Sequence, residues 1–258
     1  MAWGIDSMLR LYVQAPFAAC RTFTAGWYRP TATFLTPSAA YGLILNVAGI
    51  ESRLREEEPG HDEKTPGSLV RAGLPGVRIA LGAPHQPDGD HYPRVQQAVY
   101  QQLHNYPVGS SGKERAASAR GNKHNITPVR REVLTDLKAV IWLENLDTTC
   151  DIEDRVRRGL RGEFNSTRYG LPFLGDNSFL LDRLEVCEGT PLVHWFRRID
   201  AKSSINSSLV LRATRLTIQI DRADMSRTVS ALFAPMENPL TEVPDTAKIE
   251  LRSTNAPP

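Results

Sequence analysis

Apolar and polar residues alternate near the start of the chain. Residues 9–14 read Leu-Arg-Leu-Tyr-Val-Gln, the period-two pattern of a strand with one buried face. Short apolar runs between turn-forming residues predict further strands. They cover residues 77–82, 137–143, 179–186, 192–196, 208–211 and 214–220.

Two segments carry the spacing and end signals of helices. Residues 36–49 begin with Thr36 at the N-cap and Pro37 at the first helical position, and Gly49 stands just past the end. Residues 151–160 repeat Ile, Val and Leu at every fourth position and are followed by glycine. We predict a helix over each segment.

A long hairpin is predicted between the strands at residues 77–82 and 137–143. Residues 95–103 and 127–131 form its arms, and the segment between them is too polar to fold into a core. The resulting order, βαββαβ, is typical of ferredoxin-like (RRM-type) domains, some of which recognise RNA.

We therefore predict an α+β chain in three parts. A ferredoxin-like domain spans residues 8–188, with an insertion over about 94–131. A small β-rich extension follows over 189–240, and the Pro-rich residues 241–258 are expected to form a flexible tail.

Composition places the chain among globular proteins, since 41% of its 258 residues are hydrophobic and 23% are charged.

The net charge of +2 conceals a local excess of positive charge. Residues 94–131 hold seven basic residues and one acid, a net of +6, so the remainder sums to −4. Arginine outnumbers lysine by 25 to 6 along the whole chain, and a coding bias is sufficient to explain this excess. The position of the positive charge is what indicates a phosphate-binding element in the hairpin.

The three cysteines give no sign of a zinc site or a disulfide framework. Cys20, Cys150 and Cys187 are far apart and form no CxxC motif. No signal sequence or apolar membrane span is visible, so a cytoplasmic location is expected.

One short segment contains several potential metal ligands. Between His85 and His91 lie Asp88 and Asp90, as in some metallo-hydrolase loops. Without distant ligands to complete a site, a solvated connector is the favoured interpretation, and no metal or cofactor is predicted. Acids at 147, 151, 153 and 154 are assigned to the start of the second helix, where they complement its dipole.

The sequence lacks the motifs of ATP-dependent and zinc-deaminase enzymes. Lys123 and His124, assisted by Tyr41, are a possible apparatus for metal-free RNA cleavage, because histidine moves a proton and lysine steadies the phosphorane charge. Phosphate binding by the hairpin tip is the favoured alternative. In the loop 21–30, Phe23, Trp27 and Tyr28 offer stacking faces beside arginines.

Four segments resemble a known family when taken together. They are residues 11–21, residues 36–43 with their Thr-Pro-Ser start, residues 122–132, and Leu-Gly-Asp-Asn-Ser at 174–178. In combination they resemble the CRISPR-associated Cas-five family of the RAMP superfamily, and within it the DevS-like, Myxococcus-type branch. The resemblance extends to about residue 186.

The resemblance implies a non-catalytic subunit of the type I CRISPR Cascade complex, a ribonucleoprotein of antiviral defence. Such a subunit caps the 5′ handle of the CRISPR RNA, and a protruding thumb hairpin packs beside the Cas-seven backbone subunit. The large Cascade subunit would dock nearby, and target DNA would be reached through the complex by RNA-guided DNA targeting.

Carried over by position, the resemblance implies RNA contacts from four regions. They are Arg21, Trp27, Tyr28 and Arg29 in the first loop; Ser38 and Tyr41 in the first helix; Lys113, Arg115, Arg120, Lys123, His124, Arg130 and Arg131 in the thumb; and Arg168, Tyr169 and Gly175 in the late glycine-containing loop.

Two alternatives stay open. In a branch without a Cas-six enzyme, the family member itself cuts the repeat RNA with Tyr, Lys and His. Lys123 and His124 resemble that pair, which keeps a metal-independent endoribonuclease as the alternative function. A metallo-hydrolase built on the 85–91 segment is a more distant one.

Overall fold

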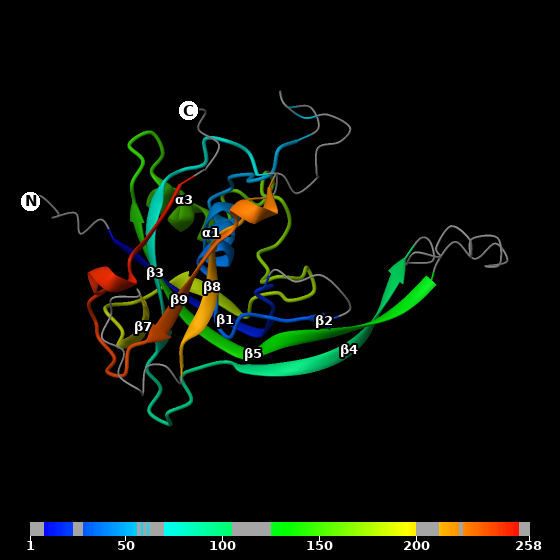
Figure 1. Ribbon diagram of the computed structural model, residues 1–258. Coiled ribbons are helices and arrows are strands. Elements are labelled where there is room, and N and C mark those ends of the chain that lie inside the picture. The colour runs from blue at the N-terminus through cyan, green and yellow to red at the C-terminus, as the bar shows by residue number, and fades with distance from the viewer. Residues whose placement is uncertain are drawn as a thin grey trace, which may run out of the picture.

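The computed structural model describes residues 8–22, 28–55, 58, 61, 70–104, 125–199, 212–221 and 224–252 (Figure 1). In chain order its elements are β1 (Leu9–Ala18), β2 (Tyr28–Arg29), α1 (Pro37–Val47), β3 (Val77–Pro84), β4 (Arg94–His104), β5 (Asn125–Asn145), α3 (Ile152–Leu160), β6 (Arg183–Val186), β7 (Val193–Arg198), β8 (Thr214–Gln219), η1 (Met225–Arg227), β9 (Val229–Pro235), η2 (Asp245–Ala247) and β10 (Ile249–Leu251). The α+β class predicted from the sequence is confirmed.

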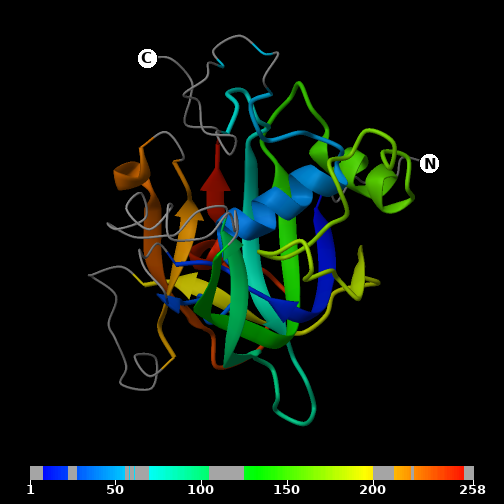
Figure 2. The same ribbon diagram turned by 90° about the vertical axis from the view of Figure 1, so that its right-hand side faces the viewer.

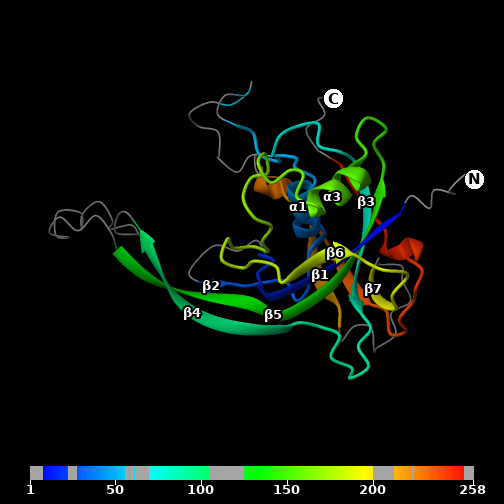
Figure 3. The ribbon, with the colours of Figure 1, turned by 180° about the vertical axis from the view of Figure 1, so that it is seen from behind.

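These strands join one sheet whose main path runs β6-β1-β5-β3-β7-β9-β8. Each neighbouring pair on that path is antiparallel. Figure 2 shows α1 lying across one face of the sheet, and α1 also contacts α3. Seen from behind, β6 and its neighbour β1 lie side by side at one end of the main path of the sheet (Figure 3).

Both faces of the central strands are covered. The inward residues of β1, Leu9, Leu11 and Val13, are almost fully buried under the helices, as their alternation with polar residues predicts. In β5 the run 139–143 is buried on both sides, which accounts for its continuous apolar sequence. Trp142 packs with Trp195 in a second cluster, as a core residue.

The predicted helix starts are confirmed. Thr36 caps α1 by accepting a hydrogen bond from the N–H of Ala39, and Pro37 occupies the first turn. Asp151 caps α3 by accepting from the N–H of Asp154. Because the side chain satisfies an N–H that lacks a helical partner, each cap fixes where the helix begins.

The predicted hairpin is formed by β4 and β5, which pair from Arg94 opposite Thr135 out to His104 opposite Asn125. The segments 127–131 and 137–143, predicted as separate strands, belong to a single strand of 21 residues. Asp136 lies between them with a φ of 55°, next to Thr135, where the pairing of β5 with β4 begins. The β4–β5 ribbon then projects away from the other strands (Figure 1).

Three predictions about the later chain need revision. The tail expected to be flexible from residue 241 includes β10, which pairs with β3 and buries Leu251, so that prediction is wrong as far as residue 252. The strand predicted over 179–186 is shortened to β6, and β9 was not predicted. The strand predicted over 208–211 falls outside the described residues.

No helix in the described part of the chain is long and apolar enough to cross a bilayer.

Candidate nucleic-acid interface

A cavity of about 520 Å³ lies between α1, the end of β1 and residues 168–177, which we call the glycine loop. Four of the residues predicted to contact RNA line this cavity, although they come from separate parts of the chain: Arg21, Ser38, Tyr169 and Gly175. The fold therefore brings the first loop, the start of α1 and the glycine loop to one site.

The glycine loop is fastened to the end of β1 by main-chain contact. The N–H of Ala19 donates to the carbonyl of Leu174 at 3.0 Å. Gly175 has a φ of +85°, and a Cβ there would lie 1.8 Å from the carbonyl oxygen of Ala19. Only glycine allows this approach, because any side chain would meet backbone.

Arg131 holds the other side of the glycine loop. Its side chain is 4% exposed and donates to Asp176 Oδ2 at 2.6 Å and to the carbonyl of Gly175 at 3.4 Å. The prediction that Arg131 contacts RNA is corrected here, because a buried guanidinium committed to this pair has no access to a phosphate. Arg131 instead positions the loop that lines the cavity.

The Asp176 carboxylate is stabilised in its charged form. Partial burial acts to raise its pKa, but hydrogen bonds from Ser178 and Arg131 outweigh burial and lower the pKa to about 2. The ion pair is therefore intact at neutral pH.

Two residues that sequence reasoning missed shape the cavity. The Arg53 guanidinium lies 3.5 Å from the centre of the Tyr169 ring, and Asn46 Nδ2 donates to the carbonyl of Tyr169 at 3.0 Å. Asn46 Oδ1 is buried without a hydrogen-bond partner among the described residues. Tyr169 itself is 63% exposed. The site thus offers a cation, an aromatic ring and an unused acceptor.

No local pattern pointed to these two residues. Arg53 stands in a charged run, which the sequence indicates only as a helix end passing into a solvated loop. Asn46 stands inside the α1 sequence, and its use depends on the glycine loop more than 120 residues away.

Tyr41, predicted near the RNA, does not line this cavity. Its hydroxyl donates to the carbonyl of Pro75 at 2.6 Å, and burial raises its pKa far above the ordinary range. Ser38, by contrast, faces the cavity, where its hydroxyl is 3.2 Å from that of Thr36.

A second group of predicted residues meets at the base of the β4–β5 ribbon. β2 pairs in parallel with β5, which places Tyr28 opposite Arg130 and Arg29 opposite Arg131. The Tyr28 hydroxyl donates to Glu132, and this hydrogen bond raises the tyrosine pKa. Glu132 also accepts from the N–H of Thr31 at 3.0 Å, so it fixes the first loop against the ribbon.

Several predicted contacts fall outside the described residues. They are Trp27, Lys113, Arg115, Arg120, Lys123 and His124. Of the remaining ones, Arg168 lies in the glycine loop and donates to Asn165, while Arg130 is exposed on the ribbon.

The 85–91 segment has a partner that the sequence did not reveal. His194 of β7 lies against both of its histidines, with 3.1 Å between His85 Nδ1 and His194 Nε2. The expectation that these histidines lack a distant ligand partner is therefore wrong.

Comparison with known proteins gives one curated relative of significant similarity. The CRISPR-associated protein Cas5 of Myxococcus xanthus (strain DK1622) is 26% identical over 188 residues, which span 71% of this chain and 73% of the relative. No family model matches the chain.

Two solved structures are similar in outline. A chain of a "CRISPR RNA-guided surveillance complex" has a TM-score of 0.49 and 13% identity, covering 93% of this chain and 95% of that one. A structure described as "Crystal structure of Cas protein" has a TM-score of 0.40 and 12% identity, covering 90% and 95%. The relative from Myxococcus confirms the resemblance given by the sequence motifs: the chain is similar to the CRISPR-associated Cas5 family, in its Myxococcus-type branch.

Proposed function

We propose that this chain binds the 5′ handle of a CRISPR RNA as a non-catalytic subunit of a Cascade complex. The observation that carries the proposal is the cavity beside α1, where Arg21, Ser38 and Tyr169 meet from three separate segments. These residue types suit single-stranded RNA, which is recognised by stacking, by hydrogen bonds to base edges and by contacts to the 2′-hydroxyl.

The strand order supports a ferredoxin-like body for this function. β6-β1-β5-β3, all antiparallel, with α1 between β1 and β3 and α3 between β5 and β6, is the arrangement that the βαββαβ order implies. The β4–β5 ribbon fits the thumb of the resemblance, and its projection leaves it accessible to a backbone subunit (Figure 1).

One nucleotide of the handle fits the chemistry of the cavity. The exposed ring of Tyr169 gives a base a stacking surface, and Arg53 supports that ring from one side. Asn46 also lines the cavity and holds the glycine loop in place through the carbonyl of Tyr169. At the start of α1, the backbone N–H of Ser38 is offered to a phosphate, since Pro37 has no N–H and those of Ala39 and Ala40 donate to Thr36.

Our proposal also assigns surfaces to the partners that the resemblance implies. We assign the backbone subunit to the β4–β5 ribbon and the handle to the glycine-loop side. Target DNA and the large subunit are reached only within the assembled complex.

Binding of a handle RNA tests the proposal directly. Fluorescence anisotropy compares the repeat-derived 5′ handle with a scrambled RNA of the same length. Tyr169→Ala removes the stacking surface and is expected to weaken handle binding roughly 5- to 100-fold, the range for loss of one stacked base. Arg227→Ala is the control, because this arginine of η1 is exposed and does not line the cavity.

Equal affinity of the unaltered chain for handle and scrambled RNA contradicts handle recognition. Equal loss of affinity in the Tyr169 and Arg227 variants contradicts the cavity as its site.

The non-catalytic part of the proposal is tested separately. The Tyr41 hydroxyl is hydrogen-bonded to Pro75 and its pKa is raised by burial, which disfavours its use as a proton acceptor in RNA cleavage. We expect no specific cutting of repeat RNA in the presence of EDTA. Specific cutting that disappears in His124→Ala overturns the proposal in favour of the endoribonuclease, and cutting that needs an added divalent ion favours the hydrolase.

A further inference from the structure

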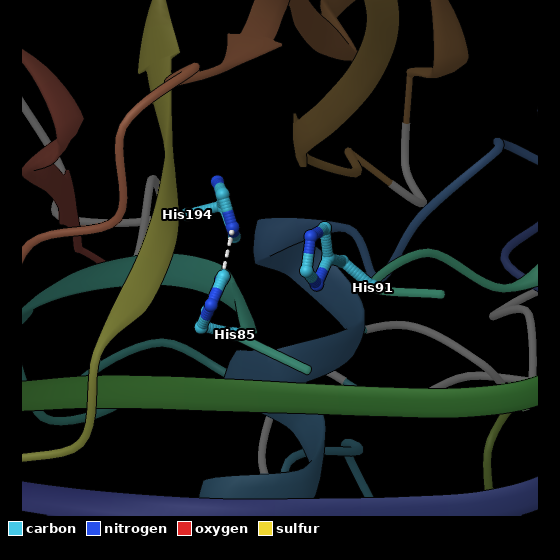
Figure 4. A group of neighbouring side chains, drawn as sticks. All are labelled: His85, His91 and His194. Atoms are coloured by element: carbon cyan, nitrogen blue, oxygen red, sulfur yellow. Dashed lines mark hydrogen bonds between the residues drawn. The ribbon is translucent and has the colours of Figure 1, made fainter. Parts of the chain in front are cut away.

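Three histidines converge at the end of β3, where it meets β7, two of them from one connector and the third more than 100 residues later. His85 directly follows β3, His91 comes from the connector that leads to β4, and His194 belongs to β7 (Figure 4). One potential ligand nitrogen from each ring lies within 4.8 Å of the other two. Sequence separations as large as 109 residues show that the fold, rather than a local motif, assembles the group.

The buried member is oriented as a metal ligand. His194 is 5% exposed, and its Nδ1 lies 3.0 Å from the carbonyl of Met236. A carbonyl only accepts, so Nδ1 carries the proton and the lone pair is on Nε2, which faces His85. Metal-binding histidines are held in this way, by a hydrogen bond from the other ring nitrogen to a carbonyl or carboxylate.

The separation of two nitrogens already fits a metal ion. His85 Nδ1 and His194 Nε2 are 3.1 Å apart. Two nitrogens bound tetrahedrally to zinc at 2.0–2.1 Å lie about 3.3 Å from each other. A metal would therefore replace the proton that these two rings now share, with little change in the N–N separation and a rotation of each ring toward the ion.

His91 completes the group from the connector. Its ring centre is 4.9 Å from that of His85 and 4.3 Å from that of His194. Its Nδ1 accepts a hydrogen bond from the N–H of Gln86 at 2.9 Å, and binding through that nitrogen requires exchange of this bond for the metal. The connector supplying the donor is exposed, so the adjustment falls on a surface loop and not on the sheet.

Nearby charges act in both directions. Asp88 favours a positive charge at His91, while Arg212 opposes one. The same charges act on a bound cation, which Asp88 attracts and Arg212 repels.

We propose that His85, His91 and His194 form a binding site for one divalent transition-metal ion, of which zinc fits the all-imidazole ligand set best. Three protein ligands leave a fourth position for water. The ion would join the 85–93 connector to β7 and so fix the point from which the β4–β5 ribbon begins.

Zinc binding by the full-length, untagged chain tests this proposal. After removal of metal with a chelator, titration calorimetry with Zn²⁺ is expected to give one site per chain. His91→Asn changes only the connector ligand and should weaken binding at least 100-fold, whereas His61→Asn, which alters a histidine of another loop, should leave it unchanged. Zn²⁺ should raise the thermal midpoint of the unaltered chain by several degrees and that of His91→Asn by much less.

Cobalt substitution identifies the ligands independently of stability. Co²⁺ bound by imidazoles gives visible d–d bands without the thiolate charge-transfer band that a cysteine ligand produces. Both His91→Asn and a second variant, His85→Asn, should abolish the d–d bands. Absence of stoichiometric binding, equal binding by His91→Asn, or a thiolate band overturns the proposal.

Discussion

Arg131 in β5 and Asp176 in the glycine loop form an ion pair of 2.6 Å, next to Gly175, which lines the candidate RNA cavity. The arginine is buried, while the aspartate keeps 28% of its side-chain surface exposed. The pair therefore connects the projecting ribbon, through β5, to the loop that supplies Tyr169 and Gly175.

The pair should contribute to stability more than any surface arginine does. Arg131→Ala leaves Asp176 partly buried without its partner and is expected to lower the free energy of unfolding by about 2–3 kcal/mol. Arg130→Ala is the matched control, since that neighbouring residue is exposed, and should change stability by less than about 0.5 kcal/mol. Urea unfolding of the three proteins measures the difference. Similar losses in both variants would show that the ion pair is not the cause.

The same pair makes stability depend on acid pH. Asp176 has its pKa lowered to about 2 in the fold, against 3.8 as the ordinary value. Because the folded chain holds Asp176 in its charged form, the carboxylate stabilises the fold above about pH 3.8. This stabilisation is lost as the pH falls through about 2. We expect roughly 1–2 kcal/mol of the stability at pH 5 to disappear near pH 2 for this reason, after allowance for solvent screening.

Asp176→Asn isolates this contribution. Its unfolding free energy should be lower than that of the unaltered chain at pH 5, and the gap should narrow as the pH falls toward 2. Circular dichroism during urea titration at each pH follows the change. A gap of constant size would mean that another group carries the acid dependence.

Gly175 is expected to be far less tolerant of substitution than Gly170, although both lie in the glycine loop with positive φ. A methyl group at 175 would meet the carbonyl of Ala19, while one at 170 has nothing within 4 Å. Gly175→Ala should therefore lower stability by about 2–5 kcal/mol, and Gly170→Ala by about 1 kcal/mol from backbone strain alone.

Handle affinity distinguishes the two glycine variants further. Gly175→Ala displaces the loop from β1 and should weaken binding of the handle RNA at least tenfold, while Gly170→Ala should retain most of it. Anisotropy at a temperature where both variants are folded makes the comparison. If Gly175→Ala binds as well as the unaltered chain, the docked glycine loop is not needed for recognition.

Local signals account for the part of the fold that the sequence predicted. Thr36 and Pro37 fix the start of α1 through contacts within four residues, so the helix is visible without knowledge of its surroundings. The alternation in β1 is equally local, because one face of that strand is buried and the other is not. β10 is different: three residues after a Pro-rich segment become a strand only because β3 offers a free edge.

The candidate sites depend more heavily on distant contacts. Arg131 looks like one more basic residue of the ribbon until Asp176 is placed beside it. His85 and His91 attract notice as neighbours, but His194 stands within an apolar strand with no adjacent ligand residue. Asn46 and Arg53 gain their roles from Tyr169 in the same way. Pairings of this kind leave no trace in periodicity or spacing.

The salt dependence of RNA binding tests whether the positive charge of residues 94–131 contacts the handle. Each phosphate contact on a single strand contributes about 0.7 to the slope of log affinity against log salt concentration, because bound counterions are released. Arg120→Ala combined with Lys123→Ala should therefore lower the slope by about 1.4 and weaken binding most at low salt. Arg215→Ala combined with Arg227→Ala removes the same charge outside this segment and should leave the slope unchanged. Affinities measured between 50 and 300 mM salt, roughly the range over which such slopes are resolved, decide between the two. Equal slopes for both double variants would mean that only net charge matters, and that Arg120 and Lys123 do not contact phosphates of the handle.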